Sequence, residues 1–192
     1  MNLQVLGPFR IHSNDSENIF HNPIAKESGI YIYAVPYEEK RFLASYVGET
    51  GASFLKRIKE HTINTLGGYY RIYDPVALKK GKKELLWNGL WKSTRQGYFN
   101  EFTERYRELA PSIYDFHTMF SVFLVPLESE PRLRRRIESA IANHLYQQPE
   151  PVGTFMDSDI RYIKHLQKGE KQILIEISGG REIIGFPKRV IA

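Results

Sequence analysis

The sequence predicts a mixed α/β (α+β) domain: a small, largely antiparallel central sheet of three strands, flanked by helices and accompanied by extra hairpins. β-Branched and aromatic runs typical of strands occur at 29–35, 42–48 and 118–125. Between them, apolar residues recur at the spacing of amphipathic helices. The length of 192 residues, with 42% hydrophobic and 26% charged residues, fits a globular domain and excludes wholesale disorder.

The first two strand runs are joined by a short polar link at 36–41, which predicts an antiparallel hairpin with a turn longer than two residues. Ser53 is then a suitable N-cap, and the apolar residues after it predict a helix over 53–62. Asn88-Gly89 lies between two short apolar runs and predicts a tight hairpin, because that turn needs positive φ at both central residues.

The later elements are predicted in the same way. A four-then-three spacing of apolar residues predicts a helix over 100–109. Ser129-Glu130-Pro131 opens a well-marked helix that ends before Pro149. Near the C-terminus we expect a short helix over 160–167 and a closing hairpin formed by 173–177 and 183–186.

These elements divide the chain into three parts. Residues 1–27 are polar and carry no clear periodicity, so we interpret them as an irregular N-terminal arm. Residues 28–150 form the main domain, with an insertion at about 63–116. Residues 151–192 are a C-terminal extension that we expect to pack on the same domain.

Composition excludes several classes of function. The chain has no cysteine, which removes disulfide scaffolds, thiolate metal sites and cysteine nucleophiles. A net charge of +5 is a mild bias toward anionic partners. No window approaches about 18 consecutive apolar residues, and the first residues do not resemble a secretory signal. We therefore expect a cytoplasmic protein that has no membrane partner.

Five polar or ionisable residues stand out because they lie among apolar neighbours. Tyr31 ends the tripeptide Gly-Ile-Tyr on the first strand, and Tyr46 begins Tyr-Val-Gly at the end of the second. Arg57 and His61 are four residues apart on the next helix, which places them on one face. Glu138 comes much later and borders the apolar stripe of the helix that follows Pro131.

This ordered set resembles the GIY-YIG nuclease family, which is named for two such tripeptides. The family pattern continues with an Arg and, in some branches, a His four residues on, matched by Arg57 and His61. It ends with a Glu on a later helix, matched by Glu138. The resemblance covers about 28–61 and 118–148. Unlike some members, the chain has no Asn about a dozen residues after that Glu.

The resemblance implies a stand-alone, divalent-metal-dependent endonuclease that hydrolyses nucleic-acid phosphodiester bonds, in DNA rather than RNA. Glu138 would be the ligand of Mg²⁺ or Mn²⁺, since these ions accept one carboxylate together with phosphate and water. Arg57 would hold the non-bridging phosphate oxygens. Tyr31, beside Tyr46, would orient the attacking water, and either Tyr31 as phenolate or His61 would take its proton.

Basic residues interleaved with aromatic ones predict a nucleic-acid surface, because lysines neutralise phosphates and exposed aromatic rings stack on bases. An alternative of equal weight is that the tryptophans close a small separate hydrophobic core and the lysines keep the edge of that core soluble. Of the arginines at 132–136, about two can face one ligand. The expected contact residues are Lys56, Arg71, Lys79, Lys80, Lys82, Lys83, Lys92, Arg95, Arg134 and Arg135.

No zinc finger or helix-turn-helix pattern is present to direct such a nuclease. Targeting would then come from the insertion, the C-terminal region, self-association into a homo-oligomer, or a partner protein. Two alternatives stay open from the sequence. The first is a non-catalytic nucleic-acid-binding module on the same scaffold, and the second is a hydrolase of small phosphoesters with no polymer substrate.

Overall fold

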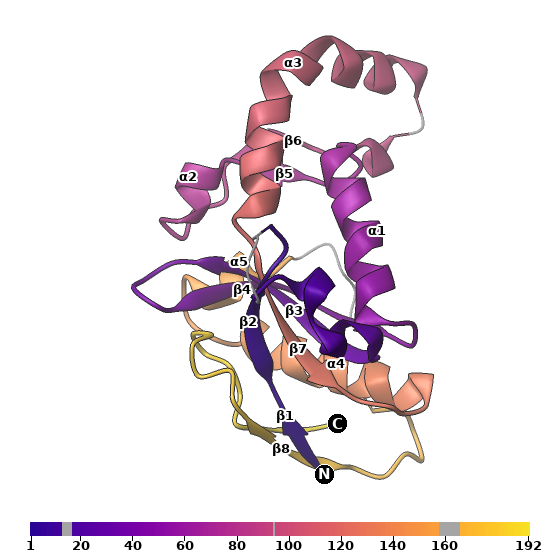
Figure 1. Cartoon of the computed structure of the whole chain (residues 1–192). Helices are drawn as coiled ribbons and strands as arrows, with labels where there is room; N and C mark the ends of the chain where they lie inside the picture. The colour runs from indigo at the N-terminus through magenta and orange to yellow at the C-terminus, as the bar shows by residue number, and fades with distance from the viewer. Residues whose placement is uncertain (13–16, 94, 158–165) are drawn as a thin grey trace.

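The computed structural model describes residues 1–12, 17–93, 95–157 and 166–192 (Figure 1). Its centre is an antiparallel sheet in the order β2-β7-β3-β4. The strands are β2 (Leu6–Arg10), β7 (Ser121–Pro126), β3 (Gly29–Pro36) and β4 (Phe42–Thr50). The α+β class is confirmed, and so is the β3–β4 hairpin. The sheet has four strands and not three.

Both faces of the sheet are covered, which is why β3 is buried along almost its whole length. On one face Ile30 and Ile32 belong to the core that includes Ile137 of helix α4 (Pro131–Tyr146). On the other face Tyr31 packs in the core that includes Ile58 of helix α1 (Phe54–Leu66). The period-two alternation of strand side chains therefore assigns Tyr31 to the α1 face.

The fourth strand comes from the segment predicted to be an irregular arm, 1–27. Within it β1 (Asn2–Gln4) and β2 are strands, and η1 (Ile19–His21) and η2 (Pro23–Lys26) are 3₁₀ helices. The pairing partners of β1 and β2 lie more than a hundred residues away. Because a short strand is stabilised by such distant partners, its local sequence carries little signal.

The C-terminal extension also differs from its prediction. Strand β8 (Leu174–Ser178) lies in a second sheet of order β1-β8-β9, parallel to β1 and antiparallel to β9 (Arg189–Ile191). The expected partner 183–186 is not a strand, and only Ile183 makes an isolated bridge, to Phe42. The extension packs on the main domain, where Arg136 of α4 donates to the carbonyl of Ala192.

The insertion forms a separate layer above the sheet in Figure 1. It contains a two-stranded sheet and helix α3, with the short helix α5 from the C-terminal extension nearby. The bounds are β5 (Ile72–Tyr73), α2 (Pro75–Leu78), β6 (Leu85–Trp87), η3 (Leu90–Lys92), α3 (Gln96–Thr118) and α5 (Val152–Phe155).

The hairpin predicted at Asn88-Gly89 is wrong. Strand β6 pairs with β5, and residues 90–92 form the 3₁₀ helix η3. Only Gly89 has positive φ, whereas the predicted turn needs it at both central residues. Two hydrogen bonds draw this segment to an earlier loop instead, because the Leu90 N–H and the Trp87 indole N–H both donate to the Gly68 carbonyl.

Helix α3 is much longer than the predicted 100–109. It continues through Pro111, and buried Ile113 and Phe116 extend its apolar stripe. The third strand consequently begins at Ser121 and not at 118. Most of the short helix expected over 160–167 lies outside the described residues. No helix in the described part of the chain is both long and apolar enough to span a bilayer.

Candidate functional site

The hairpin of β3 and β4 brings the two tripeptides together. Tyr31 lies directly opposite Gly48, and Tyr33 lies opposite Tyr46. A Cβ atom on Gly48 would come within 2.4 Å of the Tyr31 Cζ and hydroxyl and 2.6 Å of the Tyr46 Cε1. Glycine is therefore required at this position, because any side chain would displace both phenols.

A bulge in β4 gives Tyr46 its direction. Tyr33 pairs with Tyr46 but Ala34 pairs with Ala44, so Ser45 is the extra residue. Since a bulge re-aims side chains, Tyr46 shares the α1 face with the other phenols while Ala44 joins the opposite core. The ring centroids of Tyr31 and Tyr46 are 5.9 Å apart.

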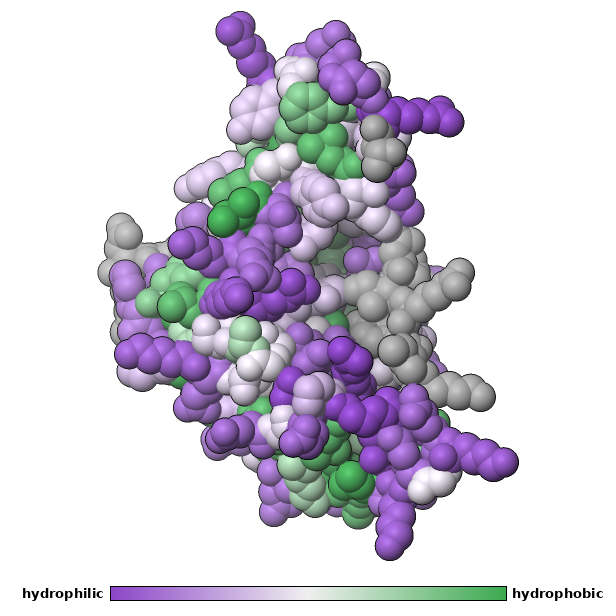
Figure 2. Space-filling view, turned by 90° about the vertical axis from the view of Figure 1, so that its right-hand side faces the viewer, coloured by the Kyte–Doolittle hydropathy of each residue, from purple (hydrophilic) through white to green (hydrophobic). Residues whose placement is uncertain are grey.

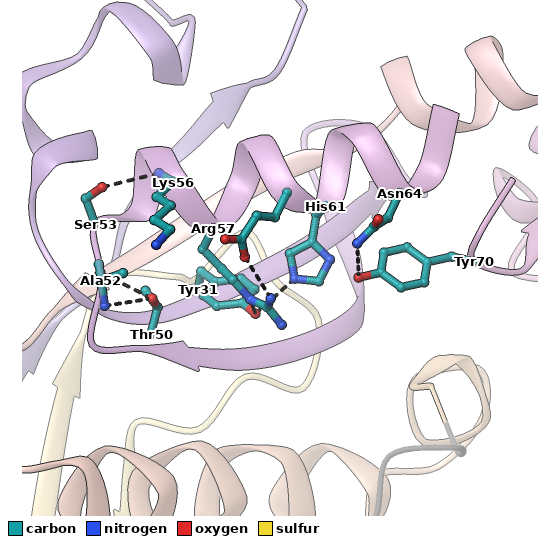
Figure 3. A network of polar contacts seen from close by, with 10 residues as sticks. Tyr31, Thr50, Ala52, Ser53, Lys56, Arg57, His61, Asn64 and Tyr70 are labelled. Carbon is teal, nitrogen blue, oxygen red and sulfur yellow. Dashed lines mark hydrogen bonds and ion pairs between the residues drawn. The ribbon is translucent and has the colours of Figure 1, made fainter. Parts of the chain in front are cut away.

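Helix α1 supplies a guanidinium and an imidazole to these phenols (Figure 3). Ser53 caps the helix through the Lys56 N–H, as predicted. One turn apart, Arg57 and His61 both reach the Tyr31 oxygen: Arg57 Nε donates to it at 3.1 Å, and it lies 3.0 Å from His61 Nε2. Glu60 anchors the same guanidinium with an ion pair of 3.1 Å.

Burial and charge fix the protonation states of this group. Desolvation, reinforced by the Arg57 charge, lowers the pKa of His61 to about 3. The imidazole is therefore neutral near pH 7, and its Nε2 forms a hydrogen bond with the Tyr31 hydroxyl whose direction depends on which ring nitrogen carries the proton. Burial, and then Tyr46, raises the pKa of Tyr31 well above its ordinary value. Tyr31 is thus a neutral phenol that accepts from Arg57 and also forms hydrogen bonds with His61 and Tyr46.

Glu138 reaches the same group from the other face of the sheet. β4 is an edge strand, and the Glu138 carboxylate on α4 interacts with both the Tyr46 phenol and the backbone N–H of Glu49 at that edge. Burial, and then the Glu49 charge, raises the pKa of Glu138 to about 7. The carboxylate of Glu138 forms no ion pair with any of the described residues.

The structure therefore brings Tyr31, Tyr46, Arg57 and His61 into contact at one end of the β3–β4 hairpin, whereas Glu138 acts on this group through its charge. Tyr46 is common to the whole set, because Tyr31, Arg57 and Glu138 act on its phenol and its ring centroid lies 5.6 Å from that of His61. Arg57 also acts on Glu138, where its charge lowers the carboxyl pKa. Residues drawn from a strand pair, a helix and a second helix 77 positions later thus form one electrostatic cluster.

A divalent metal would have one carboxylate ligand here and little more. Among the described residues there is no group of three or more His, Cys, Asp or Glu side chains placed to hold a metal. The half-buried Glu138 still suits Mg²⁺, because that ion takes one or two carboxylates and completes its shell with phosphate and water. The Glu49 charge raises the pKa of Glu138, so a cation bound at Glu138 would relieve repulsion between the two carboxylates.

The arginines at the start of α4 differ in accessibility. Arg134 is buried, with Nε 2.9 Å from Glu49 Oε2 and a further hydrogen bond to the Ser129 carbonyl. It therefore joins α4 to β4 and does not lie on the surface where we expected a phosphate contact. Arg135 also pairs with Glu49, at 3.6 Å, but its side chain is 55% exposed.

Of the other predicted basic contacts, Lys56 lies in the first turn of α1 and the rest lie in the insertion. Most are exposed, but two are not: Arg71 donates to Asn88, and Lys83 donates to the Met156 carbonyl. Lys92 lies over the Trp91 ring at 4.6 Å. The exposed set comprises Lys56, Lys79, Lys80, Lys82, Lys92 and Arg95.

The site includes residues that the sequence reasoning missed. Asn64 continues the stripe of Arg57 and His61 along α1 and donates to the Tyr70 hydroxyl at 3.1 Å (Figure 3). Tyr33 lies two residues after Tyr31 and shares its face. The helical spacing 57, 61, 64 and the strand spacing 31, 33 would have found both residues. Tyr70 arrives from the insertion, where it belongs to the interleaved basic and aromatic residues that we expected to contact nucleic acid, although nothing local placed it beside His61.

The chain matches no protein-family model, and no curated protein or solved structure was found that is similar to it.

Proposed function

We propose that the protein is a divalent-metal-dependent endonuclease that hydrolyses phosphodiester bonds of nucleic acid, with DNA as the expected substrate. One observation carries this proposal. The Tyr31 phenol is held between the Arg57 guanidinium and the neutral His61 imidazole, next to Tyr46 and an unpaired carboxylate, Glu138. In-line phosphodiester hydrolysis needs a proton acceptor, a fixed cation and charge stabilisation at the departing oxygen.

The hydrogen-bond chain defines a path for the proton of the attacking water. When the His61 proton is on Nδ1, the water gives its proton to the Tyr31 oxygen while the Tyr31 hydroxyl proton moves to Nε2 of His61. An isolated phenolate would be costly in this buried position, and the concerted transfer avoids forming one. Of the two bases left open by the sequence, His61 thus holds the proton at the end and Tyr31 relays it.

Arg57 links substrate binding to this proton path. Its positive charge contributes to the low pKa of His61. A phosphate that binds the guanidinium brings a negative charge to the same place, so the pKa of His61 rises when substrate is present. Glu138 would hold the metal, which when bound supplies Lewis-acid stabilisation of the phosphate and the leaving oxygen.

The direct test is a plasmid nicking assay with Mg²⁺ or Mn²⁺. We expect the wild type to nick, and Glu138→Gln and Arg57→Ala to lose at least about 100-fold in rate, the scale for removing a transition-state contact. Glu128→Gln and Lys59→Ala are matched controls, one ahead of α4 and one on the exposed side of α1. Undiminished nicking by the Glu138 variant would remove that residue from the reaction.

One observation favours a second candidate, a non-catalytic nucleic-acid-binding module. It is the group of exposed basic residues on the insertion, Lys79, Lys80, Lys82, Lys92 and Arg95, which can neutralise phosphates without a metal. This candidate predicts binding that needs no Mg²⁺, with a log–log salt slope of about −0.9 for each duplex phosphate neutralised, and no nicking.

A further inference from the structure

A cavity of about 400 Å³ adjoins the candidate site, between the sheet, α1 and the insertion. Tyr46, Arg57 and His61 line it, so its wall is continuous with the residues that would hold a phosphate. The volume lies in the range of about 300–1,000 Å³ that is usual for small-molecule sites. On the face that carries α1, hydrophobic side chains form only small separate patches (Figure 2).

Aromatic rings from several distant segments form the walls of this cavity. They come from the loop after α1, from η3, from the end of α3 and from α5. Rings contributed by so many segments indicate a planar, apolar-faced occupant, because flat ligands gain most from stacking. These rings belong to Tyr69, Tyr70, Trp91, Phe116 and Phe155.

Two buried polar atoms in the cavity wall lack hydrogen bonds. The Tyr33 hydroxyl and Nε2 of His117 have no partner among the described residues, and the two side chains are only 8% and 2% exposed. Both residues line the cavity. Buried polar groups are nearly always satisfied. These two atoms are closed to solvent, so an occupant of the cavity would bond them only after the surrounding side chains shift.

At the end of the cavity nearest the candidate site, the wall carries the positive charge of an arginine. Arg57 lies on the cavity wall and its guanidinium is half-exposed, with 34% of the side chain accessible. A flat ring system with a polar edge, attached to an anion, is the chemistry of a nucleotide.

We propose that this cavity receives the base of a single unpaired nucleotide whose phosphate contacts Arg57, so that the substrate is single-stranded or carries an extruded nucleotide. The phosphate half of this inference rests on the proposed function. A base inside a duplex stack cannot enter a cavity, and it must be unstacked and turned outward first. The preferred substrate class is therefore unpaired nucleic acid and not regular duplex.

The test compares strands of equal charge that do or do not carry bases. The Glu138→Gln protein, without metal, is titrated with a fluorescein-labelled thymidine oligonucleotide and with an abasic strand of the same length. We expect the base-bearing strand to bind about 5- to 150-fold more tightly, the range found for base–aromatic stacking. Two further arms are added. A uridine oligonucleotide distinguishes RNA from DNA, and a duplex with one unpaired base distinguishes an extruded nucleotide from a single strand.

Two variants test whether the preference for base-bearing strands comes from the cavity. Trp91 is 43% exposed, so Trp91→Ala should fold and should lose most of the preference for bases while keeping its affinity for the abasic strand. Phe99→Ala is the matched control, because Phe99 is 52% exposed on α3 and does not line the cavity. This variant should bind both strands as the parent does.

The outcomes separate the two proposals. Equal affinity for base-bearing and abasic strands overturns the inference, whatever the nicking assay shows. A preference for bases that survives Trp91→Ala unchanged also overturns it. A Trp91-dependent preference in a protein that does not nick DNA supports the cavity and removes the nuclease.

Discussion

At the residue scale, the candidate site depends on the single oxygen of Tyr31. It accepts a hydrogen bond from Arg57 and forms another with His61, so two side chains of α1 fix the position of a strand side chain. The missing side chain of Gly48 leaves the room for this arrangement. The glycine that ends the second tripeptide therefore has a steric cause.

Gly48→Ala tests that steric cause. The added Cβ would meet Tyr31 atoms at 2.4 Å, so the phenol must move by more than the site tolerates. We expect nicking to fall by about 100-fold, the cost of a misplacement near 1 Å, with a loss of about 1–3 kcal/mol in unfolding free energy.

Gly97→Ala is the control for this substitution. A Cβ at Gly97 meets nothing within 4 Å, and the residue lies in helix α3. The change should leave nicking unaltered and raise the unfolding free energy by up to about 1 kcal/mol, because alanine favours helix. If both variants behaved alike, crowding at Tyr31 would not explain the glycine.

The depressed pKa of His61 predicts a pH dependence of stability. The folded protein keeps His61 neutral down to about pH 3, whereas the unfolded chain protonates it near its ordinary value of 6.5. Stability is therefore lost as pH falls from about 6.5 toward 3. Glu138 acts in the opposite sense, since its pKa is raised to about 7, and the stability that it contributes at low pH is lost as pH rises from about 4.5 through 7.

Comparison with His61→Phe isolates the histidine. Both proteins retain Glu138, so urea unfolding of each from pH 7 to pH 4 cancels its contribution to first order. We expect the wild type to lose more stability than His61→Phe over this interval. Parallel curves would mean that His61 titrates normally in the folded state.

At the element scale, an ion pair fixes the distance between α4 and the edge strand β4. Arg134 is buried and binds Glu49, so it holds α4 where Glu138 can reach around the sheet edge. Arg136 makes the second attachment, because it donates to carbonyls of Lys171 and Ala192 in the C-terminal extension. The arginine cluster thus serves largely to position the helix.

Arg134→Ala should weaken this attachment strongly. Removing one partner of a buried ion pair leaves the other uncompensated, and we expect a loss of about 3 kcal/mol in urea unfolding. Arg135→Ala is the paired control, since Arg135 is 55% exposed and lies 3.6 Å from the same carboxylate. It should cost less than about 1 kcal/mol. Similar costs for the two variants would contradict the attachment of α4 through Arg134.

At the scale of the whole molecule, the insertion contributes to the site it interrupts in sequence. Tyr70 is held by Asn64 of α1, and its ring lies 5.6 Å from His61. Of the two tryptophans, Trp87 is buried and stacks on Tyr98 in the core of the insertion, whereas Trp91 lines the cavity. The insertion is therefore partly a satellite core and partly a wall of the site.

The exposed lysines of the insertion distinguish a polymer substrate from a small one. Changing Lys79, Lys80 and Lys82 together to Ala should reduce the salt slope of nucleic-acid binding by up to about 0.7–0.9 for each phosphate that the variant no longer neutralises. Lys83 is spared because it hydrogen-bonds Met156. Turnover of a small phosphodiester should not change in this variant. A hydrolase of small phosphoesters that does not bind nucleic acid would show no salt-dependent binding in either protein.

The sequence by itself determined the elements whose signals are local. The β3–β4 hairpin, the Ser53 cap, the shared face of Arg57 and His61, and α4 all follow from periodicity, capping and turn length. These patterns report which side of an element faces a core. They say nothing about which distant segment covers it.

Tertiary structure alone decided the rest. It paired the N-terminal strands with β7 and β8, drew η3 to Gly68 where a hairpin was predicted, buried Arg134 against Glu49, and closed the aromatic cavity with the insertion. Each of these depends on partners far away in the chain. Burial and hydrogen-bond satisfaction are properties of the assembled fold, so no local window of residues contains them.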